Sequence, residues 1–104
     1  MTVSIKDTEY TLGRLVTHHA MLALEIQDKQ EDQRLAVGIM VQIVTESLIH
    51  GMEKTYYDEI TPDQVAKYSK LLTTNLTLPQ ISAKFAELMA DMNSGSEAEG
   101  KPKA

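Results

Sequence analysis

The 104-residue chain contains no cysteine, so a disulfide, a cysteine-based zinc site and a cysteine nucleophile are all excluded. Positive charge is also scarce, because 15 acidic residues outnumber 10 basic residues and give a formal net charge of −5. Proteins that hold a nucleic-acid backbone or an anionic membrane surface do so with clustered Lys and Arg. This charge balance therefore argues against both kinds of partner.

Long hydrophobic runs are missing as well. The longest apolar stretch, residues 35–44, is interrupted by Gly38 and Gln42 and is far shorter than the roughly 20 residues of a transmembrane helix. The opening, MTVSIKDTEY, lacks the basic stretch and the apolar run of a signal peptide. Hydrophobic and charged residues make up 42% and 24% of the chain, which is ordinary for a globular protein. We therefore expect one cytoplasmic domain.

The common motifs of catalysis and metal binding are absent too, including phosphate-binding glycine loops and nucleophile elbows. His18 and His19 are adjacent, so on a helix they point about 100° apart and do not converge on one metal ion. We expect one of them to be half-buried and the other solvated. Glu46 and His50 have i, i+4 spacing, which we interpret as a surface helix pair because no third ligand follows. We therefore predict no enzymatic activity, no cofactor and no metal site.

The N-terminal residues predict a short β-hairpin. Apolar and polar residues alternate in residues 3–6 and again in residues 10–12, on either side of the polar pair Asp7-Thr8. This period of two is typical of paired strands, although no Asn-Gly or Asp-Gly marks the turn.

About four helices are expected after the hairpin. The first covers residues 15–29 and ends in a polar stretch, after which Asp32 is a candidate N-cap for the second. The second, residues 35–50, is apolar nearly all round, which predicts burial on several sides. The other helices, a second copy of the chain or a partner would cover its apolar sides. Gly51 is the expected C-cap of this helix.

Two strong start signals define the last two helices. Thr61 and Thr77 are each followed by a proline within two residues and by a glutamine at the third, the pattern of a capping box. The final helix carries a clear apolar stripe, made of Ile81, Phe85, Leu88, Met89 and Met92. No large apolar residue follows, so we expect residues 93–104 to form a disordered polar tail. The prediction is a mainly α domain (α+β at most) over residues 1–92.

The candidate partner-binding residues are apolar or aromatic residues that lie outside the apolar stripes of the expected helices. They are Val41, Ile49, Met52, Tyr56 and Tyr57. Val41 and Ile49 would form a seam with a second copy or a client, unless they belong to the core. Tyrosine is favoured in interfaces because it brings a large contact area at small entropic cost. Packing of Tyr56 or Tyr57 over the core edge is the alternative for that pair. The six methionines suit an adaptable groove or plain core.

The opening TVSIKDTEYTLGRL followed by helices resembles the layout of phage tail assembly chaperones. These small proteins begin with a short hairpin, enter their helices through an aromatic-x-Leu-x-x-Leu turn and end in a polar tail. Tyr10, Leu12 and Leu15 match that turn, and the helix starts ITPDQV and LTLPQI suit such a protein. The resemblance implies a protein client, the long tape-measure protein, which the apolar helix faces would cover in the bacterial host cytoplasm. We also expect a homo-oligomer.

Two other hypotheses stay open. Residues 61–92 allow a helix-turn-helix DNA-binding regulator, with residues 81–92 as the recognition helix. A recognition helix presents Arg, Lys, Asn or Gln to base edges, yet the lysines of this segment are balanced by acidic residues. A small enzyme or ligand binder would use the polar loop at residues 56–59. A protein partner is favoured over both.

Overall fold

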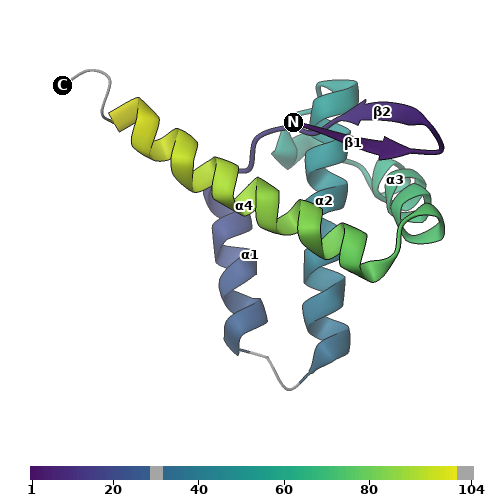
Figure 1. Ribbon diagram of the computed structural model, residues 1–104, viewed down its shortest axis with the longest axis horizontal. Helices are drawn as coiled ribbons and strands as arrows, with labels where there is room; N and C mark the ends of the chain where they lie inside the picture. The colour runs from purple at the N-terminus through teal and green to yellow at the C-terminus, as the bar shows by residue number, and fades with distance from the viewer. Residues whose placement is uncertain (29–31, 101–104) are drawn as a thin grey trace.

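The computed structural model describes the backbone of residues 1–28 and 32–100, and the side chains of these residues as far as residue 93 (Figure 1). The described residues form a two-stranded antiparallel hairpin and four α-helices, which confirms the predicted mainly α fold. In chain order the elements are β1 (Thr2–Ile5), β2 (Thr8–Thr11), α1 (Thr17–Asp28), α2 (Gln33–Glu53), the 3₁₀ helix η1 (Tyr57–Glu59), α3 (Pro62–Asn75) and α4 (Leu78–Gly100).

The hairpin turns at Lys6-Asp7, one residue earlier than the polar pair that the sequence suggests. Thr2 pairs with Thr11 and Ile5 with Thr8, which leaves a two-residue loop. Both loop residues have positive φ angles, 53° and 63°, as the primed turns of tight hairpins require. One face of the hairpin then presents Val3 and Ile5 to the core, where both are buried.

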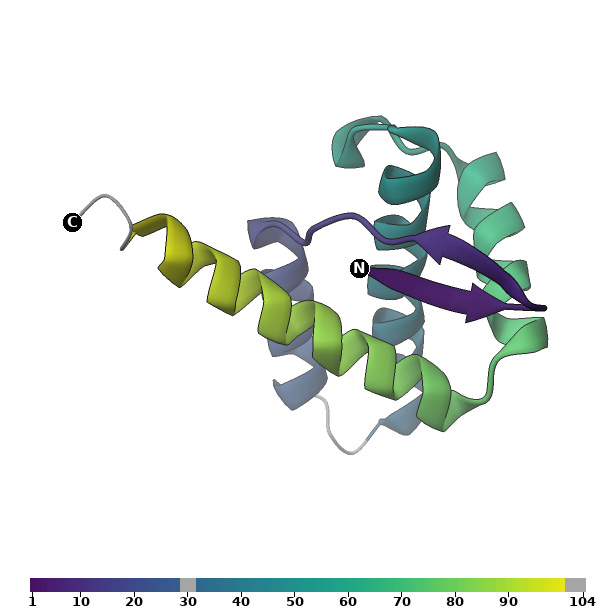
Figure 2. The same cartoon turned by 45° about the horizontal axis from the view of Figure 1, so that its top comes forward.

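Helix α2 is the centre of the molecule. It contacts β2, α1, α3 and α4, and Figures 1 and 2 show α1 beside it and α4 crossing both helices. Its buried apolar residues are Ile39, Ile43, Val44, Leu48 and Ile49. This confirms the burial predicted from a helix that is apolar nearly all round. By length and composition alone α2 would also be able to cross a membrane, and 44% of its most apolar part is buried inside the protein.

The prediction of Gly51 as the C-cap is wrong. Helix α2 continues to Glu53, and Lys54 ends it in the left-handed conformation with its N–H donating to the His50 carbonyl. Gly51 is instead a buried packing residue inside the helix, because a Cβ there would lie 2.2 Å from the carbonyl oxygen of Thr11. Only glycine allows α2 to approach the end of β2 so closely.

The first helix begins at Thr17, two residues later than predicted, whereas the three predicted N-caps, Asp32, Thr61 and Thr77, are confirmed. The Asp32 carboxylate accepts from the N–H of Leu35 at 3.1 Å, which separates α2 from α1. Both capping boxes form. The Thr61 and Thr77 hydroxyls accept the glutamine N–H three residues on, and the side-chain oxygen of that glutamine accepts the threonine N–H.

Helix α4 extends past residue 92, where the sequence places the end of the domain, to Gly100. The backbone of residues 93–100, which the sequence places in a disordered tail, is therefore helical. The rest of the predicted tail, residues 101–104, lies outside the described residues. Within the described part, Ile81 and Leu88 fix α4 to the core.

Candidate functional site

The loop that leads from β2 into α1 is fastened to the middle of α2. The Gly13 N–H donates to the Ser47 carbonyl at 2.8 Å, and the Ser47 hydroxyl donates to the Gly13 carbonyl at 2.6 Å. A Cβ at position 13 would lie 2.4 Å from the Cδ2 atom of His50, so glycine is required for this approach. These contacts fix the position of residues 14–16, of which Leu15 is buried and Val16 is exposed.

His19, in the first turn of α1, is completely buried and uses both ring nitrogens. Its Nδ1 accepts from the Val16 N–H at 3.1 Å, so in the neutral ring the proton sits on Nε2, 2.9 Å from a Glu46 carboxylate oxygen. The side chain of His18 is 55% exposed. The predicted split between the two histidines is thus confirmed in direction, but His19 is more deeply buried than expected.

The predicted surface pair of Glu46 with His50 is wrong, because each side chain has another partner. Glu46 accepts from His19 and, at 3.1 Å, from the Gln42 amide, whereas the His50 Nδ1 lies 2.8 Å from the Thr55 carbonyl oxygen. Burial acts to raise the pKa of Glu46. The hydrogen bonds from His19 and Gln42 outweigh it, so the pKa of the carboxyl lies below its ordinary value.

Tyr57 joins η1 to this cluster. Its ring lies edge-on to His19 and stacks on His50, with 4.5 Å between ring centroids in both cases. Its hydroxyl donates to the Arg14 carbonyl at 2.7 Å. Burial and the neighbouring negative charge of Glu46 raise the pKa of Tyr57 to about 12, so the hydroxyl stays protonated as a donor. Tyr57 therefore packs over the core edge, which is the alternative that the sequence left open for Tyr56 or Tyr57.

A hollow of about 660 Å³ opens beside Tyr57, and we call it the tyrosine hollow. Its lining residues are Val16, His18, Tyr56, Tyr57, Asp58 and Glu59. Tyr56 is 68% exposed and Val16 is 44% exposed, so two apolar walls face solvent. Asp58 and Glu59 add negative charge at one side.

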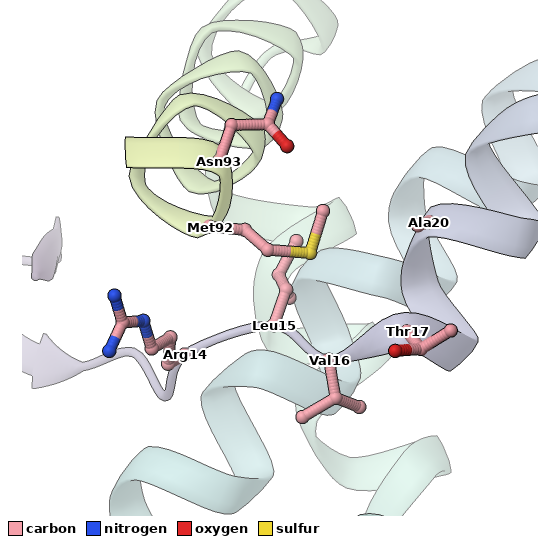
Figure 3. A pocket seen from close by; sticks show the side chains of 7 residues that line it. All are labelled: Arg14, Leu15, Val16, Thr17, Ala20, Met92 and Asn93. Atoms are coloured by element: carbon pink, nitrogen blue, oxygen red, sulfur yellow. The ribbon is translucent and has the colours of Figure 1, made fainter. Parts of the chain in front are cut away.

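A second hollow, of about 420 Å³, lies between the start of α1 and the far part of α4, and we call it the methionine hollow (Figure 3). Its lining residues are Arg14, Leu15, Val16, Thr17, Ala20, Met92 and Asn93. In Figure 3 the Met92 side chain extends toward Leu15, while Val16 points to the opposite side of the loop. Val16 belongs to both hollows, so the loop at residues 14–17 separates them.

The outward face of α1 lies between the two hollows. Met21 and Leu24 are three residues apart and are 64% and 58% exposed. At about 100° per residue, this face is flanked by His18, which lines the tyrosine hollow, and by Ala20, which lines the methionine hollow. We call the two hollows together with Met21 and Leu24 the α1 surface.

The predicted partner-binding residues divide into surface and core. Tyr56 and Tyr57 line the tyrosine hollow. Val41 is half-buried against the core, and Ile49 is 0% exposed. Ile49 as a partner-facing residue is therefore wrong, because the neighbouring elements cover α2 on the side that carries it.

Met52 is 39% exposed, but it lies outside both hollows. Its sulfur accepts the Thr11 N–H at 3.1 Å, which ties the end of α2 to β2. Sequence reasoning missed Val16, Met21 and Leu24 as surface residues. A signal existed for α1, since Met21 and Leu24 fall beside the stripe of Leu15, Leu22 and Ile26 rather than on it.

Among the residues described, no group of three His, Asp or Glu side chains is placed to hold a metal ion. The polar atoms of His19, Glu46 and Tyr57 form hydrogen bonds to one another, to Gln42 or to the backbone, and these bonds hold the loop and η1 in place. The α1 surface can accept large apolar side chains, with acidic groups beside them.

Compared with known proteins, the chain matches no family model, no curated protein and no solved structure.

Proposed function

We propose that this protein is a non-enzymatic binding module whose α1 surface receives an apolar helical segment of a client protein. The observation that carries the proposal is the run of exposed large apolar side chains around one helix: Val16, Met21, Leu24 and Tyr56. Exposed large apolar side chains that lie close together mark interaction sites in globular proteins. The two hollows would take side chains that project from such a segment on either side of α1.

The chemistry of the surface favours a helix as the client. Helices bind in apolar grooves through anchors spaced three or four residues apart, and methionine adapts its shape to such anchors. Met21 is exposed on the outward face of α1, and Met92 lines the methionine hollow together with Ala20. Asp58 and Glu59 would favour a client with a basic residue next to its apolar anchor.

The finer hypothesis is a phage-type tail assembly chaperone that covers apolar segments of a tape-measure protein. It rests on the resemblance in layout at Tyr10, Leu12 and Leu15. Self-association through the same surface is the homo-oligomer that this hypothesis expects.

The alternative, a DNA-binding regulator built on residues 61–92, has less support. The side chain of Lys84 is 20% exposed and donates to the Thr2 carbonyl at 3.0 Å and to Glu87 at 3.1 Å. The other exposed positions of α4 through residue 93 include Ser82, Glu87 and Asp91, which give no cationic face for phosphates.

Affinity capture of the tagged protein from its native source, with mass spectrometry of the bound proteins, tests the proposal. The wild type should retain a helix-rich protein after nuclease treatment. A double variant, Leu24→Glu with Tyr56→Ala, should lose it by about tenfold or more, because a charge would face the client's apolar side chains.

The matched control is Leu78→Glu, which places the same charge at an apolar residue that is 48% exposed and lies outside the α1 surface. The control should bind as the wild type does. Equal binding by the double variant would contradict the proposal, and loss of all prey on nuclease treatment would favour the DNA-binding alternative.

A further inference from the structure

A third hollow, of about 450 Å³, lies between the hairpin and α3, and we call it the lysine hollow. Its lining residues are Lys6, Tyr10, Lys67, Tyr68, Lys70, Leu71, Thr74 and Asn75. Three of the chain's 10 basic residues thus line one hollow, and no acidic residue lines it. The lining of this hollow is therefore positively charged, whereas the chain as a whole has a net charge of −5.

Two elements that are distant in sequence bring these lysines together. Lys67 and Lys70 are three residues apart on α3 and share one face of that helix. Lys6 comes from the hairpin turn and has a φ of 53°, a conformation in which Asn, Asp or Gly is the ordinary residue. The turn therefore holds a lysine where backbone conformation disfavours it.

One carboxylate, that of Glu53, contacts two residues that line the hollow, Tyr68 and Lys67, although Glu53 itself does not line it. It accepts from the Gln64 amide at 2.8 Å and from the Tyr68 hydroxyl at 2.7 Å, and these bonds hold its pKa below the ordinary value. Its contact with Lys67 is longer, 3.7 Å. Within the described residues, Lys6 and Lys70 have no ion-pair partner. Asp7 follows Lys6 in the turn but does not line the hollow.

We propose that the lysine hollow binds a small molecule that carries a di- or triphosphate group. Each lysine ammonium is a compact point charge, so three of them suit an anion whose oxygens are spread over several atoms rather than one planar carboxylate. The volume is in the ordinary range for small-ligand sites, and Tyr10 provides an aromatic wall for the rest of such a molecule, while the Lys67 ammonium lies over the Tyr68 ring, 5.1 Å from its centroid. This site is separate from the α1 surface and does not depend on the proposed function.

Titration of the ¹⁵N-labelled full chain with inorganic tripolyphosphate at low salt, followed by NMR, tests the proposal. Saturable shifts should concentrate in residues 6–10 and 67–75 and weaken as salt screens the charges. Binding of a nucleoside triphosphate with shifts in the same residues would also support the site. Shifts that are non-saturable and spread over all basic residues would overturn it, as would binding of single-stranded DNA without binding of tripolyphosphate.

Variants separate the site from general electrostatics. Lys67→Gln with Lys70→Gln should weaken tripolyphosphate binding by about tenfold or more while leaving the exposed face of α3 helical. Arg34→Gln, which removes an exposed charge at the start of α2, should change it little. Equal weakening by both changes would contradict a specific site.

Lys6→Asn gives an independent test, because asparagine tolerates the left-handed backbone better than lysine does. This variant should unfold at a temperature no lower than that of the wild type and still bind tripolyphosphate several-fold more weakly. Unchanged affinity in a folded Lys6→Asn chain would show that the turn lysine takes no part.

Discussion

At the scale of single residues, His19 is the side chain on which the candidate site most depends. It is buried, it accepts from the loop that carries Val16, and it donates to Glu46 on the neighbouring helix. Sequence spacing cannot reveal this pair, because the two residues are 27 positions apart and meet only when α1 packs on α2. The i, i+4 spacing suggested His50 as the partner of Glu46. That prediction was wrong because it considered only residues one helical turn apart.

Replacement of His19 should destabilise the protein. His19→Ala removes a buried ring and leaves the Val16 N–H and the Glu46 carboxylate without their partner, so we expect a loss of about 2–4 kcal/mol in the free energy of unfolding. The matched change at the half-exposed neighbour, His18→Ala, should alter it by less than about 0.5 kcal/mol. Urea denaturation of both variants measures the difference, and similar losses would contradict the assigned role of His19.

Glu46 makes part of this stability depend on pH. Its folded pKa lies below the ordinary value of 4.5, so its contribution is fully present above pH 4.5 and is lost as the pH falls through the folded pKa. Glu46→Gln should therefore be less stable than the wild type at neutral pH, and the difference should shrink below pH 4.5. Denaturation curves of both proteins across this range test the sign. A difference that grows with acid would contradict it.

At the scale of elements, the parts that the sequence predicts well are those set by neighbouring residues. The caps at Thr61 and Thr77 depend on contacts over three positions and were predictable. The end of α2 was not predictable from neighbouring residues, because Gly51 is required by the close approach of the Thr11 carbonyl, which lies on β2. The burial of Ile49 was equally out of reach, since periodicity shows that α2 is apolar all round but not which elements cover each side.

The two glycines of α2 should respond in opposite directions to alanine. Gly51→Ala brings a Cβ against the Thr11 backbone and should cost about 2–3 kcal/mol, because α2 and β2 must separate. Gly38→Ala meets nothing within 4 Å and should stabilise the helix by about 0.5–1 kcal/mol. Thermal unfolding of the two variants is the measurement. Equal effects at both positions would contradict the packing assigned to Gly51.

At the scale of the whole molecule, α2 separates the two candidate binding surfaces. Figures 1 and 2 show α1 on one side of α2 and the hairpin with α3 on the other. The α1 surface is apolar with acidic groups beside it, whereas the lysine hollow is basic. The overall charge could be read from the sequence, but this division could not, because it depends on which elements pack side by side.

The central claim, that α1 receives a client protein, is tested most directly by site-specific photo-crosslinking in the native source. A photoreactive phenylalanine analogue would replace Leu24 on the α1 surface and, as the control, Leu78 on α4. Our account predicts a crosslink from position 24 to a different, helix-rich protein and none from position 78. Crosslinks from neither position, from position 78 alone, or only to a second copy of this chain would contradict a client on the α1 surface.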